Sequence, residues 1–92
     1  MTISDQTVLQ RLSDVRFRPV DDETVVVRQE AAEALVLNEV SGRILELVDG
    51  KLTLTEIVGV LADEYEIDVE TLRGDVISHV SELVEIGLVA IV

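Results

Sequence analysis

The side chains that could do chemistry are few and scattered in this sequence of 92 residues. It contains one histidine, His79, and no cysteine, which excludes disulfides, thiolate metal sites and cysteine nucleophiles. A zinc site at His79 would need carboxylates for its other ligands, an arrangement that zinc proteins seldom use. We therefore expect His79 to flank the core or a groove, without a metal.

Other patterns of catalytic residues are missing as well. No serine lies in a nucleophile elbow, and the acidic runs at 21–23 and 63–64 are typical of solvated turns and helix ends. The glycines stand apart from one another, so there is no phosphate-binding loop. A small chain also has little room for a deep substrate cavity. We expect a binding module with no catalytic residue, no metal and no cofactor.

The charge balance limits the partners. Seven Lys and Arg stand against nineteen Asp and Glu, which gives a net charge of −12. Nucleic acid and anionic membranes attract basic surfaces, so we expect neither as a partner. The longest apolar run, Leu88–Val92, is too short to span a membrane, and the N-terminus does not resemble a signal peptide. We expect a cytoplasmic protein.

Alternation of apolar and polar residues predicts three strands, at 15–19, 24–28 and 34–38. The first of these strands ends at a proline, and an acidic turn follows it. The preceding residues 1–14 carry few apolar side chains, and we expect them to be a flexible lead-in. Residues 15–92 are then expected to form a single domain.

Three helices are predicted after the strands. Asn38 is the expected N-cap of the first helix, and Gly50 is expected to close it. Residues 53–56 fit the capping box of the second helix. Asp68 is the expected cap of the third helix, with a left-handed ending at Gly87 and a short strand fragment after it. The order predicts an α+β, winged-helix-like fold, in which a three-stranded antiparallel sheet is followed by three helices.

The third helix has an unusually wide apolar surface. Flanking apolar residues extend its central stripe to an arc of roughly 180°, against the roughly 100° of an ordinary surface helix. Part of this arc is expected to face a removable partner, or else the helix packs on two neighbours. Its acidic residues would repel phosphates, which argues against a DNA-reading helix. The central stripe consists of Leu72, Val76, Val80 and Leu83, with Ile77 and Val84 on one side and His79 and Ile86 on the other.

A set of short runs along the chain resembles the PqqD-like family, over about residues 15–90. Each run is weak alone, because it consists mostly of core and capping residues, whereas the ordered set is fairly specific. The runs are Leu37-Asn38, Ile44–Gly50, Thr55–Val58, Glu64-Tyr65, Leu72-x-x-Asp75-Val76 and Leu83 with Gly87-Leu88-Val89.

This resemblance implies a peptide chaperone, also called a RiPP recognition element. Members of the family hold the leader of a ribosomally made precursor peptide and present it to a modifying enzyme, often a radical-SAM enzyme. The namesake pathway leads to pyrroloquinoline quinone (PQQ). The chain departs from the namesake proteins before the third strand, where Gln29-Glu30-Ala31-Ala32 replaces a common Pro-Glu pair. A different peptide pathway therefore remains open.

The resemblance also implies where a leader peptide binds. It adds as a strand beside the third predicted strand and lies against the third helix, a mode called β-augmentation. The backbone of Leu35, Val36 and Leu37 is expected to form the ladder, while the side chains of Leu35 and Leu37 belong to the core. The complete predicted peptide site comprises Ala34, Leu35, Val36, Leu37, Asn38, Leu72, Arg73, Asp75, Val76, Ile77 and Val80.

Separate roles are expected for the helix residues of this site. Val76, Ile77 and Val80 would form apolar pockets, and Arg73 and Asp75 would pair with charges of the leader. The alternative function is a structural module that has no peptide client and associates with itself through the same sheet edge. As the leader-binding protein, we expect the chain to be a monomer or weak homodimer.

Overall fold

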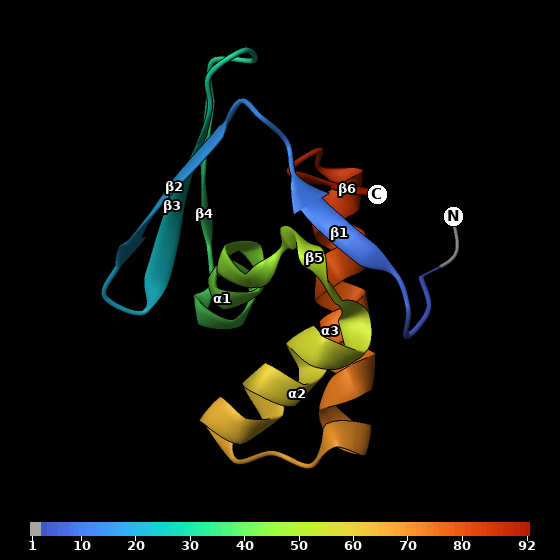
Figure 1. Cartoon of the computed structure of the whole chain (residues 1–92). Helices are drawn as coiled ribbons and strands as arrows, with labels where there is room; N and C mark the ends of the chain where they lie inside the picture. The colour runs from blue at the N-terminus through green and yellow to red at the C-terminus, as the bar shows by residue number, and fades with distance from the viewer. Residues whose placement is uncertain (1–2) are drawn as a thin grey trace.

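The computed structural model describes residues 3–92 of the chain. These residues form six strands and three helices, and the strands form two three-stranded antiparallel sheets (Figure 1). The elements are β1 (Val8–Arg11), β2 (Val15–Val20), β3 (Glu23–Arg28), β4 (Glu33–Leu37), α1 (Glu39–Leu47), β5 (Asp49–Thr53), α2 (Leu54–Tyr65), α3 (Val69–Glu85) and β6 (Val89–Ile91).

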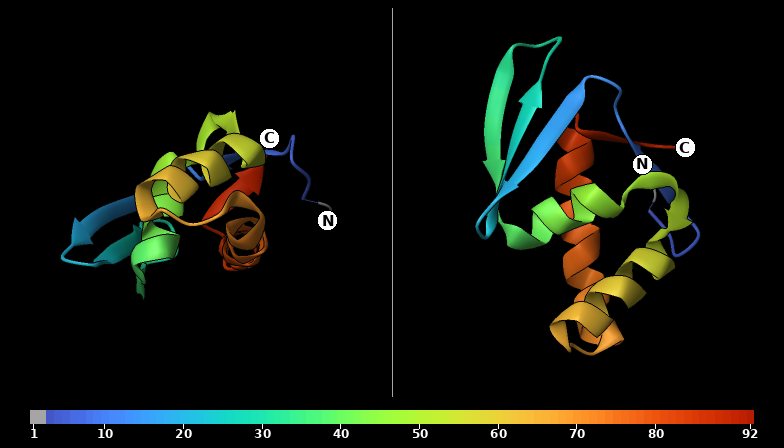
Figure 2. Two further views of the ribbon diagram at one scale, coloured as in Figure 1. Left: turned by 90° about the horizontal axis from the view of Figure 1, so that it is seen from below. Right: turned by 60° about the vertical axis from the view of Figure 1, so that its left-hand side comes forward.

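The first sheet has the order β2-β3-β4 and is made of two consecutive hairpins. Asp21-Asp22 joins β2 to β3 after the closing pair Val20 and Glu23, and residues 29–32 join β3 to β4. The sheet projects from the body of the molecule and α1 lies at its foot (Figure 1, Figure 2). This sheet and the three helices confirm the predicted α+β, winged-helix-like fold.

The second sheet, with the order β5-β1-β6, differs from the prediction for the N-terminal segment. Residues 1–14 were expected to be a flexible lead-in, yet β1 is the middle strand of this sheet and Leu9 is fully buried. The strand has the short sequence VLQR, and both its partners come from much later in the chain. The alternation of apolar and polar residues within this short segment is therefore too weak to predict β1. Residues 1–2 of the expected lead-in lie outside the described residues.

The helix boundaries follow their caps, with one correction. The Asn38 side chain accepts a hydrogen bond from the backbone N–H of Ser41, and residues 53–56 form the predicted capping box. The prediction that Gly50 closes α1 is wrong, because α1 ends at the cap residue Val48. Gly50 instead lies in β5 with φ at +82°, next to a register irregularity against β1. Glycine adopts this left-handed conformation without the steric cost of a side chain.

The end of α3 has the expected geometry. The backbone N–H of Leu88 donates to the carbonyl of Leu83, that of Gly87 donates to Val84, and Gly87 has φ at +83°. These two bonds and the left-handed glycine define a Schellman ending. Asp68 is the cap residue at the other end, but its side chain makes no capping hydrogen bond. The ending turns the chain back, so that β6 pairs with β1.

One aliphatic core lies between the two sheets and the helices. It contains the buried side of every helix together with Leu9 and Val26 from the strands and Leu88 from the turn between α3 and β6. Gly42 lies where α1 meets β3, and a Cβ atom at this position would collide with the side chain of Thr24. This close approach holds α1 against β3, and α1 begins directly after β4. The core therefore holds the β2-β3-β4 sheet in a defined position relative to α3.

Candidate functional site

The outer edge of β4 has no partner strand in residues 3–92, because β4 pairs with β3 alone. The two-residue turn makes Val20 and Glu23 a hydrogen-bonded pair. Along an antiparallel ladder, hydrogen-bonded pairs alternate with non-hydrogen-bonded pairs. Counting along β3 and across to β4, Leu35 and Leu37 bond to β3. The N–H and C=O groups of Ala34 and Val36 consequently point away from the sheet. We call this unpaired side the free edge of β4.

The opposite edge of the same sheet is much less suited to strand addition. In β2, Pro19 lies opposite Thr24 in a non-hydrogen-bonded pair. The backbone groups of β2 at this position therefore point away from β3. Proline has no N–H to donate there. The neighbouring residues Arg16 and Arg18 are exposed and charged, as is common on edges that avoid pairing. An extended peptide would therefore find a complete ladder at β4 and an interrupted one at β2.

Two sets of contacts hold the free edge of β4 beside the last turns of α3. Next to the start of β4, Arg28 donates from Nη1 to the Glu33 carboxylate, at 3.0 Å, and to the carbonyl of Ile86, at 3.3 Å. Beyond its end, Ser41 Oγ lies 2.8 Å from His79 Nδ1. The strand thus runs past the segment of α3 between His79 and Ile86, in the opposite direction.

These anchors identify which flank of α3 faces β4. At 100° per residue, His79, Glu82 and Ile86 fall on one side of the buried stripe. Glu82 and Ile86 are exposed, Ile86 by 44%, and His79 is half-buried. We call these three residues the β4-side flank of α3. Asp75, which is exposed, lies one turn earlier along the same flank.

The remaining predicted residues of α3 lie elsewhere. Leu72, Val76 and Val80 are core residues with exposures of 4%, 0% and 0%, so their side chains offer no surface. Arg73 and Ile77 are on the flank away from β4. There the guanidinium of Arg73 pairs with the Asp5 carboxylate at 2.7 Å, and Ile77 packs against the core.

The predicted residues of the strand are divided between the two faces of the sheet. Ala34 and Val36 are exposed, Val36 by 58%, whereas Leu35 is half-buried and Leu37 is in the core. Asn38 lies beyond β4, where it caps α1. Sequence reasoning did not assign His79, Glu82 or Ile86 to the site. The apolar arc of the third helix included two of them but did not indicate which side would face the sheet.

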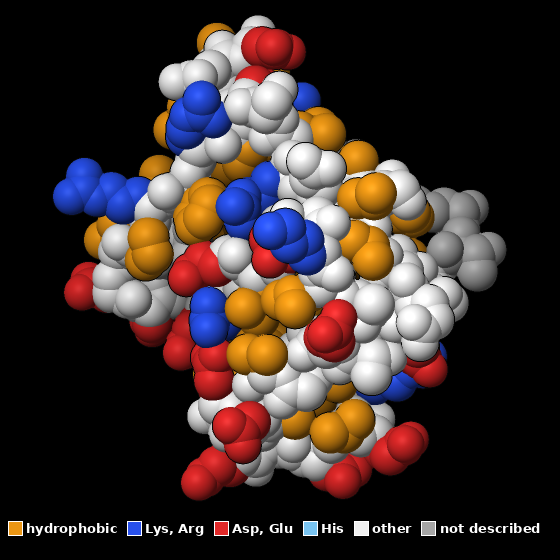
Figure 3. All heavy atoms as spheres, viewed as in Figure 1, with side chains coloured by type: hydrophobic (Ala, Val, Ile, Leu, Met, Phe, Trp, Pro, Cys, Tyr) orange, Lys and Arg blue, Asp and Glu red, His pale blue; other side chains and the backbone are white. Residues whose placement is uncertain are grey.

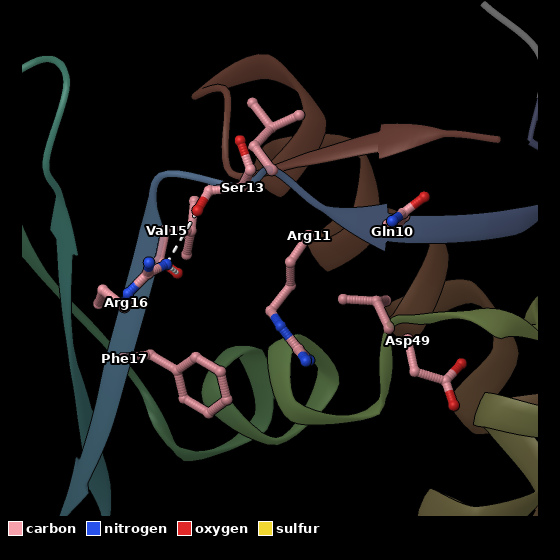
Figure 4. A pocket seen from close by; sticks show the side chains of 9 residues that line it. Gln10, Arg11, Ser13, Val15, Arg16, Phe17 and Asp49 are labelled. Carbon is pink, nitrogen blue, oxygen red and sulfur yellow. Dashed lines mark hydrogen bonds between the residues drawn. The ribbon is translucent and has the colours of Figure 1, made fainter.

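A hollow of about 400 Å³ lies between the two sheets and is lined by residues of β1 and β2, among others (Figure 4). Arg11 extends over the ring of Phe17, 5.1 Å from the ring centroid. Its Nη1 donates to the carbonyls of Leu45 and Glu46 in the last turn of α1. A cation at this end of a helix satisfies carbonyls that lack helical partners. Arg11 therefore joins the two sheets to α1.

The shifted pKa values belong to groups outside the β4–α3 region. Hydrogen bonding to Arg43 lowers the pKa of the Glu64 carboxyl, and the same contact raises the pKa of Arg43. Hydrogen bonds from the backbone N–H groups of Leu52 and Lys51 lower the pKa of Asp49. The Arg43–Glu64 pair, with 2.6 Å between Nη2 and Oε2, joins α1 to α2.

In residues 3–92, no three His, Cys, Asp or Glu side chains come together in a way that would hold a metal ion. None of the helices described is long and apolar enough to cross a membrane.

Comparison with solved structures identifies similar folds. The structure of TbiB1 in complex with the TbiA(beta) leader peptide is 25% identical, with a TM-score of 0.75, and the match covers 87% of this chain and 93% of TbiB1. The structure of the heterocyclase TruD is 20% identical, with a TM-score of 0.67. That match covers 94% of this chain but 12% of TruD, and it shows the fold alone.

Comparison with known sequences identifies the family. No curated protein matches the chain. The family model described as Coenzyme PQQ synthesis protein D (PqqD) matches residues 23–89, from the start of β3 to the first residue of β6. This range includes the free edge of β4 and all of α3. The chain belongs to the PqqD family.

Proposed function

We propose that this protein is a non-catalytic peptide chaperone that binds the leader of a ribosomally made precursor peptide. The leader adds as a strand to the free edge of β4 and is presented to a modifying enzyme, which we propose to be of the radical-SAM class. The setting of this activity is the cytoplasm, and the protein acts as a monomer or weak homodimer.

One observation carries the proposal. The backbone groups of Ala34 and Val36 point away from β3, and the strand passes the β4-side flank of α3. An added strand gains backbone hydrogen bonds from the edge whatever its sequence, and side chains beside it select among sequences. Free edges of this kind are normally protected in proteins, whereas β4 carries no proline and only one charged residue, Glu33.

The proposed site keeps the β4 part of the sequence prediction and changes the helix part. Ile86 offers the apolar contact, Glu82 offers charge, and His79 lies between them and the end of β4. Asp75 extends the same flank. The buried residues Leu72, Val76 and Val80 support this surface from the core and do not contact the leader. Arg73 and Ile77 lie on the other flank.

The similarity to TbiB1 supports this function, because that protein was solved in complex with a leader peptide and nearly its whole length is matched. Membership of the PqqD family supports the same role, because the resemblance to this family implies a chaperone that holds a leader peptide. The product is a separate question. Residues 29–32, which depart from the namesake proteins, form the turn directly before β4. We therefore propose that the protein acts in PQQ synthesis or in another peptide pathway that uses a similar adaptor.

The free edge of β4 also favours a second function, in which it pairs with the same edge of another copy. Sedimentation over a range of protein concentrations distinguishes the two. A chaperone with an unoccupied edge remains mostly monomeric at micromolar concentration and binds a leader with one-to-one stoichiometry.

Titration of the isotope-labelled protein with the leader of a precursor peptide encoded beside its gene tests the proposed function. The amide signals of residues 34–37 and 79–86 are expected to shift together, and those of 16–20 are expected to stay unchanged. A scrambled leader of the same composition is the control. Shifts confined to β2, or none with any neighbouring precursor, would contradict the proposal.

A further inference from the structure

The outer face of β2 and β3 carries a second surface that the proposed leader site does not use. A pocket of about 550 Å³ follows residues 16–20 around the edge of β2 and includes Val25 and Val27 of β3. Val20 is 46% exposed and Val27 is 41% exposed, so aliphatic surface faces solvent here. We call Arg16, Arg18, Val20, Val25 and Val27 the β2–β3 outer face.

Unlike most other arginines in this acidic chain, the two arginines of this face form no salt bridge with the described residues. The salt bridges in residues 3–92 involve Arg28, Arg43 and Arg73, each beside a carboxylate. Arg16 instead donates from Nη1 to the carbonyls of Ser13 and Val15, at 2.8 and 3.1 Å, and Figure 4 shows it against this loop. Its guanidinium is therefore held in place without a carboxylate beside it.

Arg18 lies on the same side of the sheet as Arg16, because residues two apart in a strand share a face. It is exposed and forms no salt bridge with the described residues. Figure 3 shows basic side chains mainly over β1 and β2 in the upper half of the view, and acidic ones mainly in the lower half. The β2–β3 outer face thus combines positive charge with aliphatic side chains on a chain of net charge −12.

The chemistry of this face indicates its occupant. Aliphatic side chains that are exposed in the free protein favour a partner that covers them with its own apolar side chains. Arginines without a salt bridge favour a partner that supplies carboxylates. Pro19 interrupts the adjacent edge, so the occupant is bound through side chains and not as an added strand. A second copy is a poor match in charge overall, since two chains of net charge −12 repel each other.

We propose that the β2–β3 outer face docks the modifying enzyme, through a surface of that enzyme that combines carboxylates with aliphatic side chains. This inference rests on the proposed function. β2 and β4 are separated by β3, and neighbouring strands lie about 4.8 Å apart. The leader and the enzyme therefore occupy opposite edges of one small sheet. A leader strand on β4 becomes its fourth strand, held at a fixed distance from the docked enzyme.

Two charge reversals of equal size test the surface. Arg18→Glu changes the outer face, and Lys51→Glu makes the same net change at an exposed position in β5. The probe is the purified modifying enzyme encoded beside the precursor gene, measured by calorimetry with and without leader. We expect Arg18→Glu to raise the Kd for the enzyme at least tenfold and Lys51→Glu to change it less than twofold. Neither variant should change the Kd for the leader more than twofold.

Several outcomes would overturn this docking surface. They are an equal loss with Lys51→Glu, no binding of the enzyme to the wild-type protein, and loss of leader affinity in Arg18→Glu. A self-association that Arg18→Glu abolishes would make a second copy the occupant instead. If the wild-type protein binds the enzyme through Arg18 but binds no leader, the proposed function fails while this surface stands.

Discussion

Ser41 Oγ, in the first turn of α1, lies 2.8 Å from Nδ1 of His79 in α3. The contact joins the helix that directly follows β4 to the helix that passes beside it. Ser41 is buried and follows the Asn38 cap by three residues, so its position is set by the start of α1. This hydrogen bond therefore fixes one end of the spacing between β4 and α3.

Removing the hydroxyl tests this contact. Ser41→Ala leaves the partly buried His79 ring without its partner, and we expect the free energy of unfolding to fall by about 0.5–1.5 kcal/mol. Urea denaturation measures the loss, and Ser78→Ala, at an exposed position of α3, is the control. The Kd for the leader should rise as well, because His79 no longer holds its place. Equal stability of the two variants would refute the structural role of the contact.

A proline at Val36 tests the free edge of β4. The backbone N–H of Val36 points away from β3, so Val36→Pro removes a donor that the folded protein does not use. We expect the circular dichroism spectrum to stay native and leader binding to fall at least tenfold. Val36→Thr keeps the N–H and serves as the control, with a Kd within about threefold of wild type. If Val36→Pro folds and still binds the leader normally, strand addition at β4 is wrong.

The exposed carboxylate of Glu82, on the β4-side flank of α3, predicts that leader binding depends on salt. The chain has an excess of acidic residues, so we expect the leader to carry basic residues and its affinity to fall as salt rises. Glu82→Lys should weaken binding and flatten this dependence. Glu70→Lys makes the same change on the opposite flank of α3 and should have a much smaller effect. An affinity that does not vary between about 50 and 500 mM salt would count against an electrostatic contribution.

The contact of α1 with β3 predicts opposite effects for two glycine substitutions. Gly42→Ala places a Cβ atom against the Thr24 side chain, and overpacking of this kind costs about 1–3 kcal/mol. Gly74→Ala, in α3, has no atom within 4 Å of the new methyl group. It should stabilise the protein by about 0.5–1 kcal/mol, because alanine favours helices. Thermal or urea unfolding measures both, and a stabilised Gly42→Ala variant would contradict the packing described.

The Arg43–Glu64 pair gives a pH dependence whose sign follows from its pKa shift. The pKa of Glu64 is lowered in the folded state, so its contribution is complete above the ordinary carboxyl pKa, about 4.3. It is lost as the pH falls through the lowered value. Glu64→Gln should therefore reduce stability at pH 7, and the difference from wild type should vanish once the pH falls below the lowered pKa of Glu64.

The size of this effect is between about 0 and 1 kcal/mol, because the Arg43 and Glu64 side chains are 31% and 37% exposed. Urea unfolding at several pH values measures it. Glu70→Gln is the control, since Glu70 forms no salt bridge with any described residue. A constant difference between wild type and Glu64→Gln across this pH range would show that the pair is not the cause.

Local signals were sufficient to predict most of the first sheet and the helices. Strands 15–19, 24–28 and 34–38 each have a run of alternating or β-branched residues, and each run matches a strand to within one residue at either end. The capping box at 53–56 and the left-handed Gly87 involve residues a few positions apart. Such features depend on neighbours in the chain, so the sequence alone determines them.

The second sheet and the faces of α3 needed the tertiary structure. The short strand β1 is stabilised by pairing with β5 and β6, far along the chain, so no local pattern predicts it. The apolar arc of α3 could be seen in the sequence, but not which flank faces β4. Ser41–His79 spans 38 residues and Arg28–Ile86 spans 58, and these contacts decide the flank. A helix has the same periodicity whichever way it is rotated about its axis, and only packing against distant elements sets that rotation.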